Sequence, residues 1–203
     1  AGFSGRATGK WTGEQVTFMQ RILAIWLPNW PIQRLIHDKP ELEQRPVILQ
    51  HRTRRGFCVF ACSRLARQQG VQVDFPIAEA TALLRRADHK TTSGPSDVLS
   101  GGPTGGKKAM LHLETHAPAD DRAALIKLAI WCHRFSPLVG LEETAAPDTL
   151  LLNVTGVTPL FGGEPAFAEQ ITRSFHQQRL GVRLGLSNTL GAAWALDQKT
   201  AHV

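Results

Sequence analysis

The sequence has few cysteines and no long hydrophobic run. The three cysteines, Cys58, Cys62 and Cys132, have no paired spacing, so the chain lacks a disulfide framework and its thiols are expected to be buried and reduced. A zinc site at Cys58 and Cys62 would need further ligands at zinc-finger spacing, and none follow. No apolar stretch approaches the roughly 20 residues of a transmembrane helix, and the start of the chain lacks the apolar core of a secretory signal. We expect a soluble, cytoplasmic protein.

Regular structure is also lacking in two segments rich in glycine, serine and threonine. Residues 1–20 show no hydrophobic period, and we expect a disordered leader there. Residues 88–108 have the composition of a linker. The run GGPTGGK within them resembles a phosphate-binding loop, but Lys108 follows where a hydroxyl residue should hold magnesium, and a strand is expected next where the motif requires a helix.

Positive charge is in excess: the net charge is +6 and the calculated isoelectric point is 9.7. Such a balance suits nucleic acid, because neutralising phosphates releases counterions, but many soluble proteins are mildly basic without a specific reason. The most concentrated cluster contains Arg52, Arg54 and Arg55. We predict DNA contact for these three, with a merely solvated hairpin tip as the alternative.

Hydrophobic periodicity predicts an alternation of strands and helices. In the first half we expect strands at 22–27, 47–50 and 57–61 and helices at 31–38, 63–70 and 74–84. In the second half we expect strands at 109–113, 138–142, 150–154 and 182–186, helices at 120–134 and 164–178, and a last helix from 187 or 188. The strand at 22–27 followed by the pattern α-β-β-α-β predicts an α+β fold, a ferredoxin-like sheet that an inserted segment interrupts.

Four strings in this order resemble the Y-family DNA polymerases of the UmuC/DinB type: ILAIWLPNWPIQRL at 22–35, ACSRLARQQGVQVDFPIAEA at 61–80, DTLLLNVTG at 148–156 and VRLGLSNTLGAAWALDQK at 182–199. The segments at 26–35, 133–142 and 153–163 resemble the ImuB-type branch, whose members do not polymerise DNA. The resemblance implies a palm at 21–29 and 109–203, a small α/β fingers subdomain at 30–87 and a linker at 88–108, with no thumb or little finger in this chain.

The resemblance also implies that most of the catalytic carboxylates are lost. The family's first metal-binding acid falls on Trp26, and its adjacent acidic pair falls on Asp148 and Thr149, so Asp148 is the single surviving candidate ligand. Two-metal catalysis needs two magnesium ions held mainly by carboxylates, and one carboxylate should not assemble that centre. We therefore expect no catalytic residue, no metal and no cofactor; Mg²⁺ would be needed only if the chain were an active polymerase. Asp148 is otherwise a turn residue after Pro147.

Other family positions are altered as well. The steric-gate aromatic falls on Pro31, the triphosphate-binding tyrosine on Arg64 and the last palm helix's lysine on Leu190, whereas the accompanying arginine is kept as Arg67. Arg64 and Arg67 share a helix face, so they are candidates for nucleotide or phosphate binding, or else solvated side chains. Trp26 is either a core aromatic that fills the volume of the lost acid or a base-stacking residue.

The resemblance implies a factor for DNA repair and translesion synthesis that acts as a DNA- or protein-binding scaffold and is not an enzyme. Its implied partners are DNA, an ImuA-type RecA-like protein, an error-prone DnaE-type polymerase and the sliding clamp, with no membrane. One alternative is an active error-prone polymerase, which would require acids at the positions of Trp26 and Thr149. A second is an RNA-binding ferredoxin-like module, which would carry exposed aromatics in a characteristic strand motif that is missing here.

Overall fold

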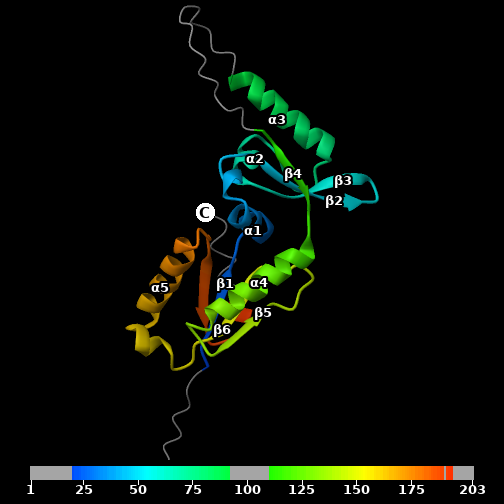
Figure 1. The fold of residues 1–203 in the computed structure, drawn as a ribbon. Coiled ribbons are helices and arrows are strands. Elements are labelled where there is room, and N and C mark those ends of the chain that lie inside the picture. The colour runs from blue at the N-terminus through cyan, green and yellow to red at the C-terminus, as the bar shows by residue number, and fades with distance from the viewer. Residues whose placement is uncertain (1–19, 92–109, 190, 194–203) are drawn as a thin grey trace, which may run out of the picture.

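The computed structural model of the chain describes residues 20–91, 110–189 and 191–193, and it contains two β-sheets (Figure 1). The four-stranded sheet consists of β1 (Ile22–Trp26), β5 (Leu138–Leu141), β6 (Thr149–Asn153) and β7 (Arg183–Ser187). Its order is β5-β6-β1-β7 and every neighbouring pair is antiparallel. With α4 (Pro118–Cys132) and α5 (Glu164–Gln177), these strands form what we call the four-stranded unit.

Both helices of this unit cover the same face of its sheet. Side chains alternate between the two faces of a strand, so Leu23 and Ile25 of β1 point to the helices while Ala24 and Trp26 point to the other face. The core between sheet and helices contains Leu23, Ile25, Leu125, Leu150, Leu152, Phe167, Ile171 and Phe175. The strand order and the chain order β1-α4-β5-β6-α5-β7 confirm the predicted ferredoxin-like α+β fold.

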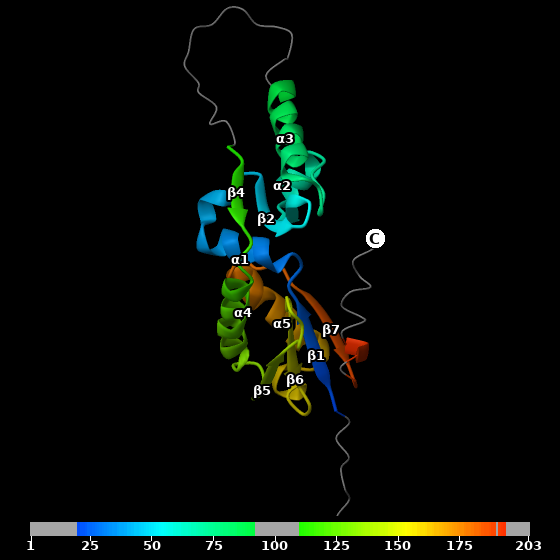
Figure 2. The ribbon, with the colours of Figure 1, turned by 90° about the vertical axis from the view of Figure 1, so that its right-hand side faces the viewer.

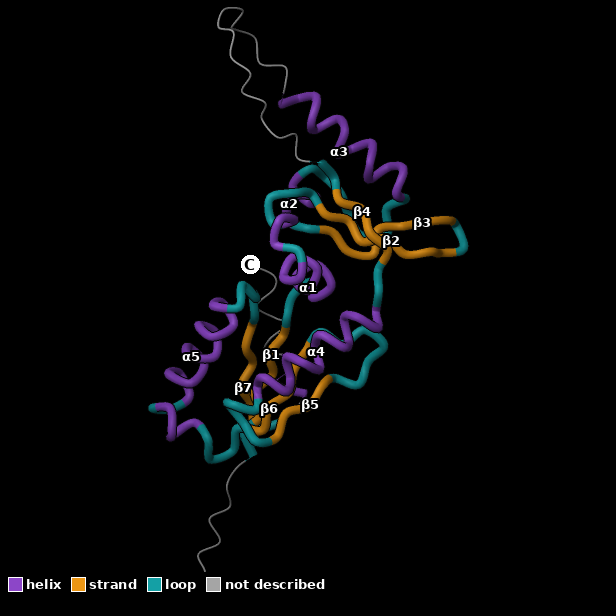
Figure 3. Tube along the Cα trace, in the orientation of Figure 1, coloured by secondary structure: helices purple, strands orange, loops and turns teal. Residues whose placement is uncertain are grey.

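The second sheet belongs to the inserted segment and has three strands (Figure 3). β2 (Val47–Thr53) lies in the middle, between β3 (Gly56–Cys62) on one side and β4 (His112–Thr115) on the other. One face is covered by α1 (Trp30–Asp38) and the short η1 (Pro40–Leu42), and the other by α2 (Arg64–Gln68) and α3 (Ile77–Thr91). We call these elements the three-stranded unit. In two perpendicular views α1 lies between the three-stranded sheet and the four-stranded unit (Figure 2).

The strand β4 differs from the sequence expectation in partner as well as position. The division of the chain before residue 109 placed this strand with the palm, but β4 pairs in parallel with β2, from Val47 opposite His112 to Gln50 opposite Thr115. The alternating pattern of a strand is local and does not say which sheet the strand joins. The chain therefore crosses between the two units at residues 27–29 and again at residues 116–117.

Most other element boundaries lie close to the sequence expectations, with three further differences. The hairpin strands β2 and β3 are longer than expected, because the polar residues of the basic cluster continue the ladder to Thr53 opposite Gly56. Helix α3 continues past the expected end at 84 to Thr91, so residues 88–91 of the expected linker are helical. The last helix does not begin at 187 or 188, because Ser187 ends β7 and residues 188–189 form a bend; residues 191–193 are helical. The rest of the expected leader and linker lies outside the described residues.

Local chemistry explains where several elements begin. Pro31 and Pro118 lie in the first turns of α1 and α4, where the missing amide hydrogen removes no helical hydrogen bond. The hydroxyl of Ser63 accepts a hydrogen bond from the amide of Ala66 and caps α2. Gly162 and Gly163 both have positive φ angles, 86° and 100°, at the turn into α5. No helix in the described part of the chain is long and apolar enough to cross a membrane.

Candidate functional site

The structure brings Trp26, Asp148 and Thr149 together at one end of the four-stranded sheet. Trp26 is the last residue of β1, and it lies directly opposite Thr149, the first residue of β6. The indole Nε1 of Trp26 donates a hydrogen bond of 2.8 Å to Oδ2 of Asp148, and the hydroxyl of Thr149 donates one of 3.0 Å to Oδ1. Each oxygen of the Asp148 carboxylate therefore accepts a hydrogen bond from one of the two residues that the sequence resemblance predicts at lost ligand positions.

This set of atoms does not fit a pair of magnesium ions. Mg²⁺ requires oxygen ligands in octahedral geometry, and a two-metal centre requires carboxylates that bridge or flank both ions. The indole N–H offers no lone pair to a metal, and Asp148 is the one carboxylate among these three side chains. Across the described ranges, no group of three or more His, Cys, Asp or Glu side chains is arranged to hold a metal ion.

Arg183 adds a cation to this cluster and was not identified from the sequence. It is the first residue of β7 and lies opposite Trp26 on the other side of β1. Its guanidinium carbon lies 5.3 Å from the centre of the Trp26 ring, a cation–π contact. The available signal was a charged residue at the start of an otherwise apolar strand, RLGL.

A small cavity lies beside this cluster, between the two units. Its volume is about 170 Å³, and its lining includes Pro31, Phe60, His116 and Asp148. Pockets for small molecules and cofactors are usually about 300–1,000 Å³. The rings of Phe60 and His116 stack at 3.6 Å between centroids with an angle of 12°, and they occupy part of the space between the units. The cavity has too little room for a nucleoside triphosphate.

A buried ionic junction holds the two units together next to this cavity. Nε of Arg34 on α1 bonds to Oδ1 of Asp121 on α4 at 2.6 Å, and Nε2 of His116 lies 2.8 Å from Oδ2 of the same carboxylate. All three side chains are nearly buried. Burial alone would lower the pKa of Arg34, but the hydrogen bond and charge of Asp121, supported by Asp38, raise it above its ordinary value. We call Arg34, His116 and Asp121 the ionic junction.

His116 forms an H-x-x-x-H spacing with His112. On a helix this spacing would place both rings on one metal ion, but these residues lie on and just after the extended strand β4. His112 pairs with Glu114, while His116 pairs with Asp121. The two rings serve separate ion pairs.

The arginines predicted to contact nucleic acid are all exposed, and they lie at two ends of β3. Arg52, Arg54 and Arg55 lie at the tip of the β2–β3 hairpin, whereas Arg64 and Arg67 lie on α2, which follows the other end of β3. Within the described part of the chain none of the five forms an ion pair. Neither Arg64 nor Arg67 lines the small cavity beside Asp148. Leu190, the altered lysine position, lies outside the described residues.

The charge of the chain is concentrated in the inserted segment. Residues 30–87 contain ten of the 23 lysines and arginines but only five of the 17 acidic residues. Nearly all of the net charge of +6 therefore belongs to residues 30–87 of the three-stranded unit. The rest of the chain is close to neutral.

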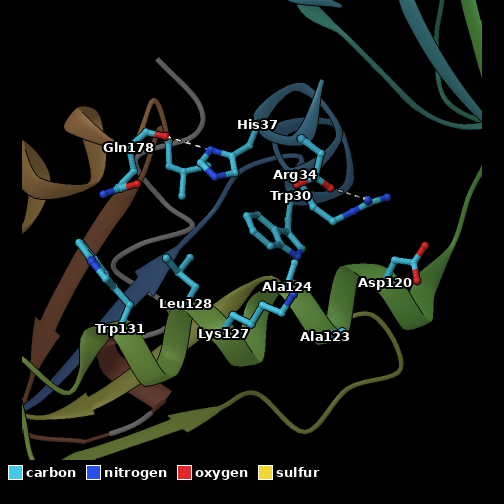
Figure 4. A pocket seen from close by; sticks show the side chains of 12 residues that line it. Trp30, Arg34, His37, Asp120, Ala123, Ala124, Lys127, Leu128, Trp131 and Gln178 are labelled. Carbon is cyan, nitrogen blue, oxygen red and sulfur yellow. Dashed lines mark hydrogen bonds and ion pairs between the residues drawn. The ribbon is translucent and has the colours of Figure 1, made fainter. Parts of the chain in front are cut away.

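A larger cavity of about 510 Å³ lies between α1 and α4 (Figure 4). Its walls are formed by Trp30 and His37 from α1 and by Lys127, Leu128 and Trp131 from α4, with Gln178 and Leu180 closing one side. Nδ1 of His37 lies 3.2 Å from the carbonyl oxygen of Gln178 across this opening. The cavity contains none of the residues that the sequence singled out as functional.

Comparison with known proteins gives similarity along most of the chain. The sequence model of the impB/mucB/samB family matches residues 25–198. Over 81 residues the chain is 42% identical to Protein ImuB of Caulobacter vibrioides (strain NA1000 / CB15N), a match that covers 40% of this chain and 17% of that protein.

Two solved structures have the same fold at low sequence identity. The insertion ternary complex of Dbh DNA polymerase gives a TM-score of 0.61 at 13% identity, over 88% of this chain and 46% of that one. DinB from Sulfolobus solfataricus gives 0.58 at 12% identity, over 88% and 45%. The chain thus spans less than half of each of these structures and less than a fifth of the curated relative.

Proposed function

The chain belongs to the impB/mucB/samB family, which is of the Y-family polymerase type, and from this we propose that it serves in DNA repair by holding DNA without copying it. This membership confirms the Y-family resemblance that the sequence strings indicated. The likeness to Protein ImuB supports the ImuB-type branch of that family. In this proposal the four-stranded unit corresponds to the palm and the three-stranded unit to the fingers. The division falls at residues 29 and 117 instead of 29 and 109.

One observation carries the claim that the chain does not polymerise DNA. Both oxygens of Asp148 are engaged by Trp26 and Thr149, the residues at the positions of the missing ligands. Phosphoryl transfer depends on metal ions that neutralise charge on the attacking and leaving oxygens. Trp26, Asp148 and Thr149 together cannot hold those two metal ions. The adjacent cavity of about 170 Å³ is too small for the triphosphate.

The distribution of charge supports DNA as the ligand. Sequence-independent binding to DNA comes from lysine and arginine contacts to phosphates, and it requires cations that are exposed and not already paired. Arg52, Arg54 and Arg55 meet both conditions at the hairpin tip, and Arg64 and Arg67 meet them on α2. We propose the hairpin arginines as the main phosphate contacts.

The remaining partners follow from the resemblance to the ImuB-type branch. An ImuA-type RecA-like protein, an error-prone DnaE-type polymerase and the sliding clamp are proposed partners of the protein. Because this chain matches only 17% of Protein ImuB, these partners are proposals for the whole protein and are not assigned to a surface of this chain.

Primer extension tests the absence of polymerase activity. The natural chain, Asp148→Ala and the double variant Trp26→Asp, Thr149→Glu are each incubated with primer–template DNA, nucleoside triphosphates and Mg²⁺. We expect no extension by the natural chain at any protein concentration, and none by Asp148→Ala. Extension by the natural chain that is lost in Asp148→Ala would overturn the proposal, because Asp148 would then be a working ligand.

Salt-dependent DNA binding tests the scaffold role. Replacing Arg52, Arg54 and Arg55 with Gln should weaken binding to primer–template DNA by about tenfold or more and reduce the slope of log K against log salt by roughly 2–3. The matched control replaces three exposed arginines of the four-stranded unit, Arg122, Arg173 and Arg179, with Gln. An equal loss in both triple variants would show that net charge alone, and not the hairpin, determines binding.

A further inference from the structure

The solvent side of α4 is apolar, whereas that of its neighbour α5 is polar. Both helices cover one face of the same sheet, and such helices usually turn an apolar stripe to the core and polar residues to solvent. α5 follows this rule, with Glu169 and Arg173 exposed. In α4 the ten residues 123–132 include a single charged one, and Ile126 and Ile130 are 42% and 64% exposed. The described part of the chain therefore leaves an apolar strip of α4 uncovered.

This strip adjoins the cavity of about 510 Å³ between α1 and α4. Ile130 lies next to Trp131 in the sequence and one turn after Lys127, and both of these residues line the cavity (Figure 4). Residues three and four apart are neighbours on a helix surface. Single exposed apolar residues are ordinary, but a continuous apolar area beside a hollow of this size is typical of a binding site. An apolar side chain of another molecule would fit into the cavity while its neighbours contact the two isoleucines.

Positive charge borders the apolar strip. Lys127 and Arg134 are both exposed, and the guanidinium carbon of Arg134 lies 4.5 Å from the centre of the Trp131 ring. Nε of Arg134 also donates a hydrogen bond of 3.2 Å to the backbone carbonyl of Trp131, which holds the cation beside the cavity. The sequence has no acidic residue from 122 to 141. Interfaces pair patches of opposite charge, so the matching surface of a partner is acidic.

The two acids that line the cavity do not alter this sign. Asp38 pairs with Arg34, whose guanidinium also bonds to Asp121. Asp120 lies in the first turn of α4, at the opposite end of the cavity from Trp131 (Figure 4). The end of the cavity beside Trp131 is therefore cationic.

We propose that the α4 surface, which consists of Ile126, Lys127, Ile130, Trp131 and Arg134, binds an amphipathic helix of a partner protein whose apolar side is bordered by acidic residues. A groove between two helices is a common seat for such a helix. Tryptophan and arginine are the residue types that most often dominate binding energy at interfaces. The proposal goes beyond the DNA-binding role and does not depend on it, because the arginines proposed for DNA all lie in the three-stranded unit.

Charge favours this occupant over a second copy of the chain and over DNA. A second copy would also carry a net charge of +6, and a symmetric contact would bring two cationic α4 surfaces together. Sequence-independent DNA binding comes from cations that contact phosphates, and to such contacts the exposed Ile126 and Ile130 add nothing.

Selection from a displayed library of helical peptides tests the α4 surface. The full natural chain is the bait, and the side chains on the outside of each displayed helix are randomised. We expect the enriched peptides to carry apolar residues at i, i+3 or i+4, and i+7, with an excess of Asp and Glu beside them. An enriched set without that acidic excess, or no enrichment at all, would overturn the proposal.

Two double variants, each with a matched control, locate the binding of an enriched peptide. Ile126→Gln, Ile130→Gln should bind it about tenfold or more weakly than the natural chain, whereas Leu160→Gln, which alters an apolar residue that is 83% exposed elsewhere, should bind it equally well. Lys127→Gln, Arg134→Gln should bind it several-fold more weakly and with less dependence on salt, whereas Arg173→Gln on α5 should not. Equal affinity of the natural chain and either double variant would contradict the proposed surface.

The same double variants distinguish the other occupants and a purely structural role. A natural chain that dimerises in sedimentation equilibrium, with the dimer lost in Ile126→Gln, Ile130→Gln, would assign the surface to a second copy. Oligonucleotide binding that is weakened in this variant would assign it to DNA. Both double variants should melt within about 2 °C of the natural chain, since exposed side chains contribute little to stability. A melting temperature several degrees lower in both would show that these residues serve the fold, and each of these three results overturns the proposal.

Discussion

The indole nitrogen of Trp26 and the carboxylate of Asp148 are joined by a hydrogen bond of 2.8 Å across the β1–β6 pair. In the proposed correspondence with the Y-family polymerases, both positions hold acids that would repel each other without metal ions. An indole at the first position gives a donor–acceptor contact in place of that repulsion. We therefore propose that this end of the sheet is a structural cluster.

Trp26→Phe should destabilise the chain by about 1–3 kcal/mol, the usual cost of losing a hydrogen bond to a charged group. An aromatic ring beside Arg183 is kept, so the main loss is the hydrogen bond between Nε1 and Asp148. Urea unfolding followed by circular dichroism measures the difference. Trp131→Phe is the matched control, because no hydrogen bond from the Trp131 indole is recorded among the described residues. Equal losses in both variants would show that the bond adds no stability.

Asp121→Asn should lower the free energy of unfolding by about 3 kcal/mol or more. The change leaves Arg34 without its buried anion, and breaking a buried ion pair by removing one partner is costly. The variant Asp120→Asn alters the preceding, exposed residue of α4 and should change stability by less than about 0.5 kcal/mol. Comparable stability of the two variants in chemical denaturation would contradict a structural role for the ionic junction.

Protonation of Glu114 should make the folded chain less stable in acid. The hydrogen bond from Lys39, opposed in part by burial and assisted by His112, lowers the pKa of Glu114 below its ordinary value of 4.5. The folded state therefore binds this proton less tightly than the unfolded state does. The resulting stability is complete above the ordinary pKa and is lost as the pH falls through the lower, folded value.

Melting temperatures of the natural chain and Glu114→Gln between neutral and acid pH measure this contribution. The difference between the two should be largest near neutrality and shrink below about pH 4. The control Glu79→Gln removes an exposed carboxylate of α3 for which no ion pair is recorded among the described residues, and it measures the effect of losing one surface charge. A Glu114→Gln difference that grows in acid would have the wrong sign for this mechanism.

Cys132 should be the least reactive thiol of the chain. Burial, opposed weakly by the charge of Arg134, raises its pKa to about 12, and the thiolate is the form that reacts. Cys58 is partly exposed, whereas Cys62 and Cys132 are buried. Peptide mapping after brief alkylation at mildly alkaline pH should find Cys58 modified first and Cys132 modified only after denaturant is added. Early labelling of Cys132 in the native chain would indicate that this part of the core opens.

The sequence was most informative where the determinants are local. The apolar run at β1, the proline at the start of α1, the Ser63 cap of α2 and the glycine pair before α5 each act within a few residues, and the elements they predicted are present. The ferredoxin-like order could also be predicted, because it depends only on the succession of elements along the chain.

What the sequence did not reveal depends on contacts between distant residues. Nothing near residue 112 indicates that β4 pairs with β2 and not with β1. Trp26 and Asp148 are 122 residues apart, and Arg34 and Asp121 are 87 apart, so neither bond leaves a periodic signal. Arg183 was missed for the same reason, since its stack on Trp26 appears only when β7 lies beside β1.

The return of the chain through β4 determines how this protein can be divided. A fragment in which the fingers subdomain ends before residue 109 would lack β4, the strand that covers one edge of β2. The backbone N–H and C=O groups at that edge of β2 would then be free to pair with another chain. An excised four-stranded unit should instead join residue 29 to residue 117. Swapping the inserted module between relatives likewise requires that residues 112–116 be transferred with residues 30–91, because the last strand of the module follows the segment of linker composition at 88–108.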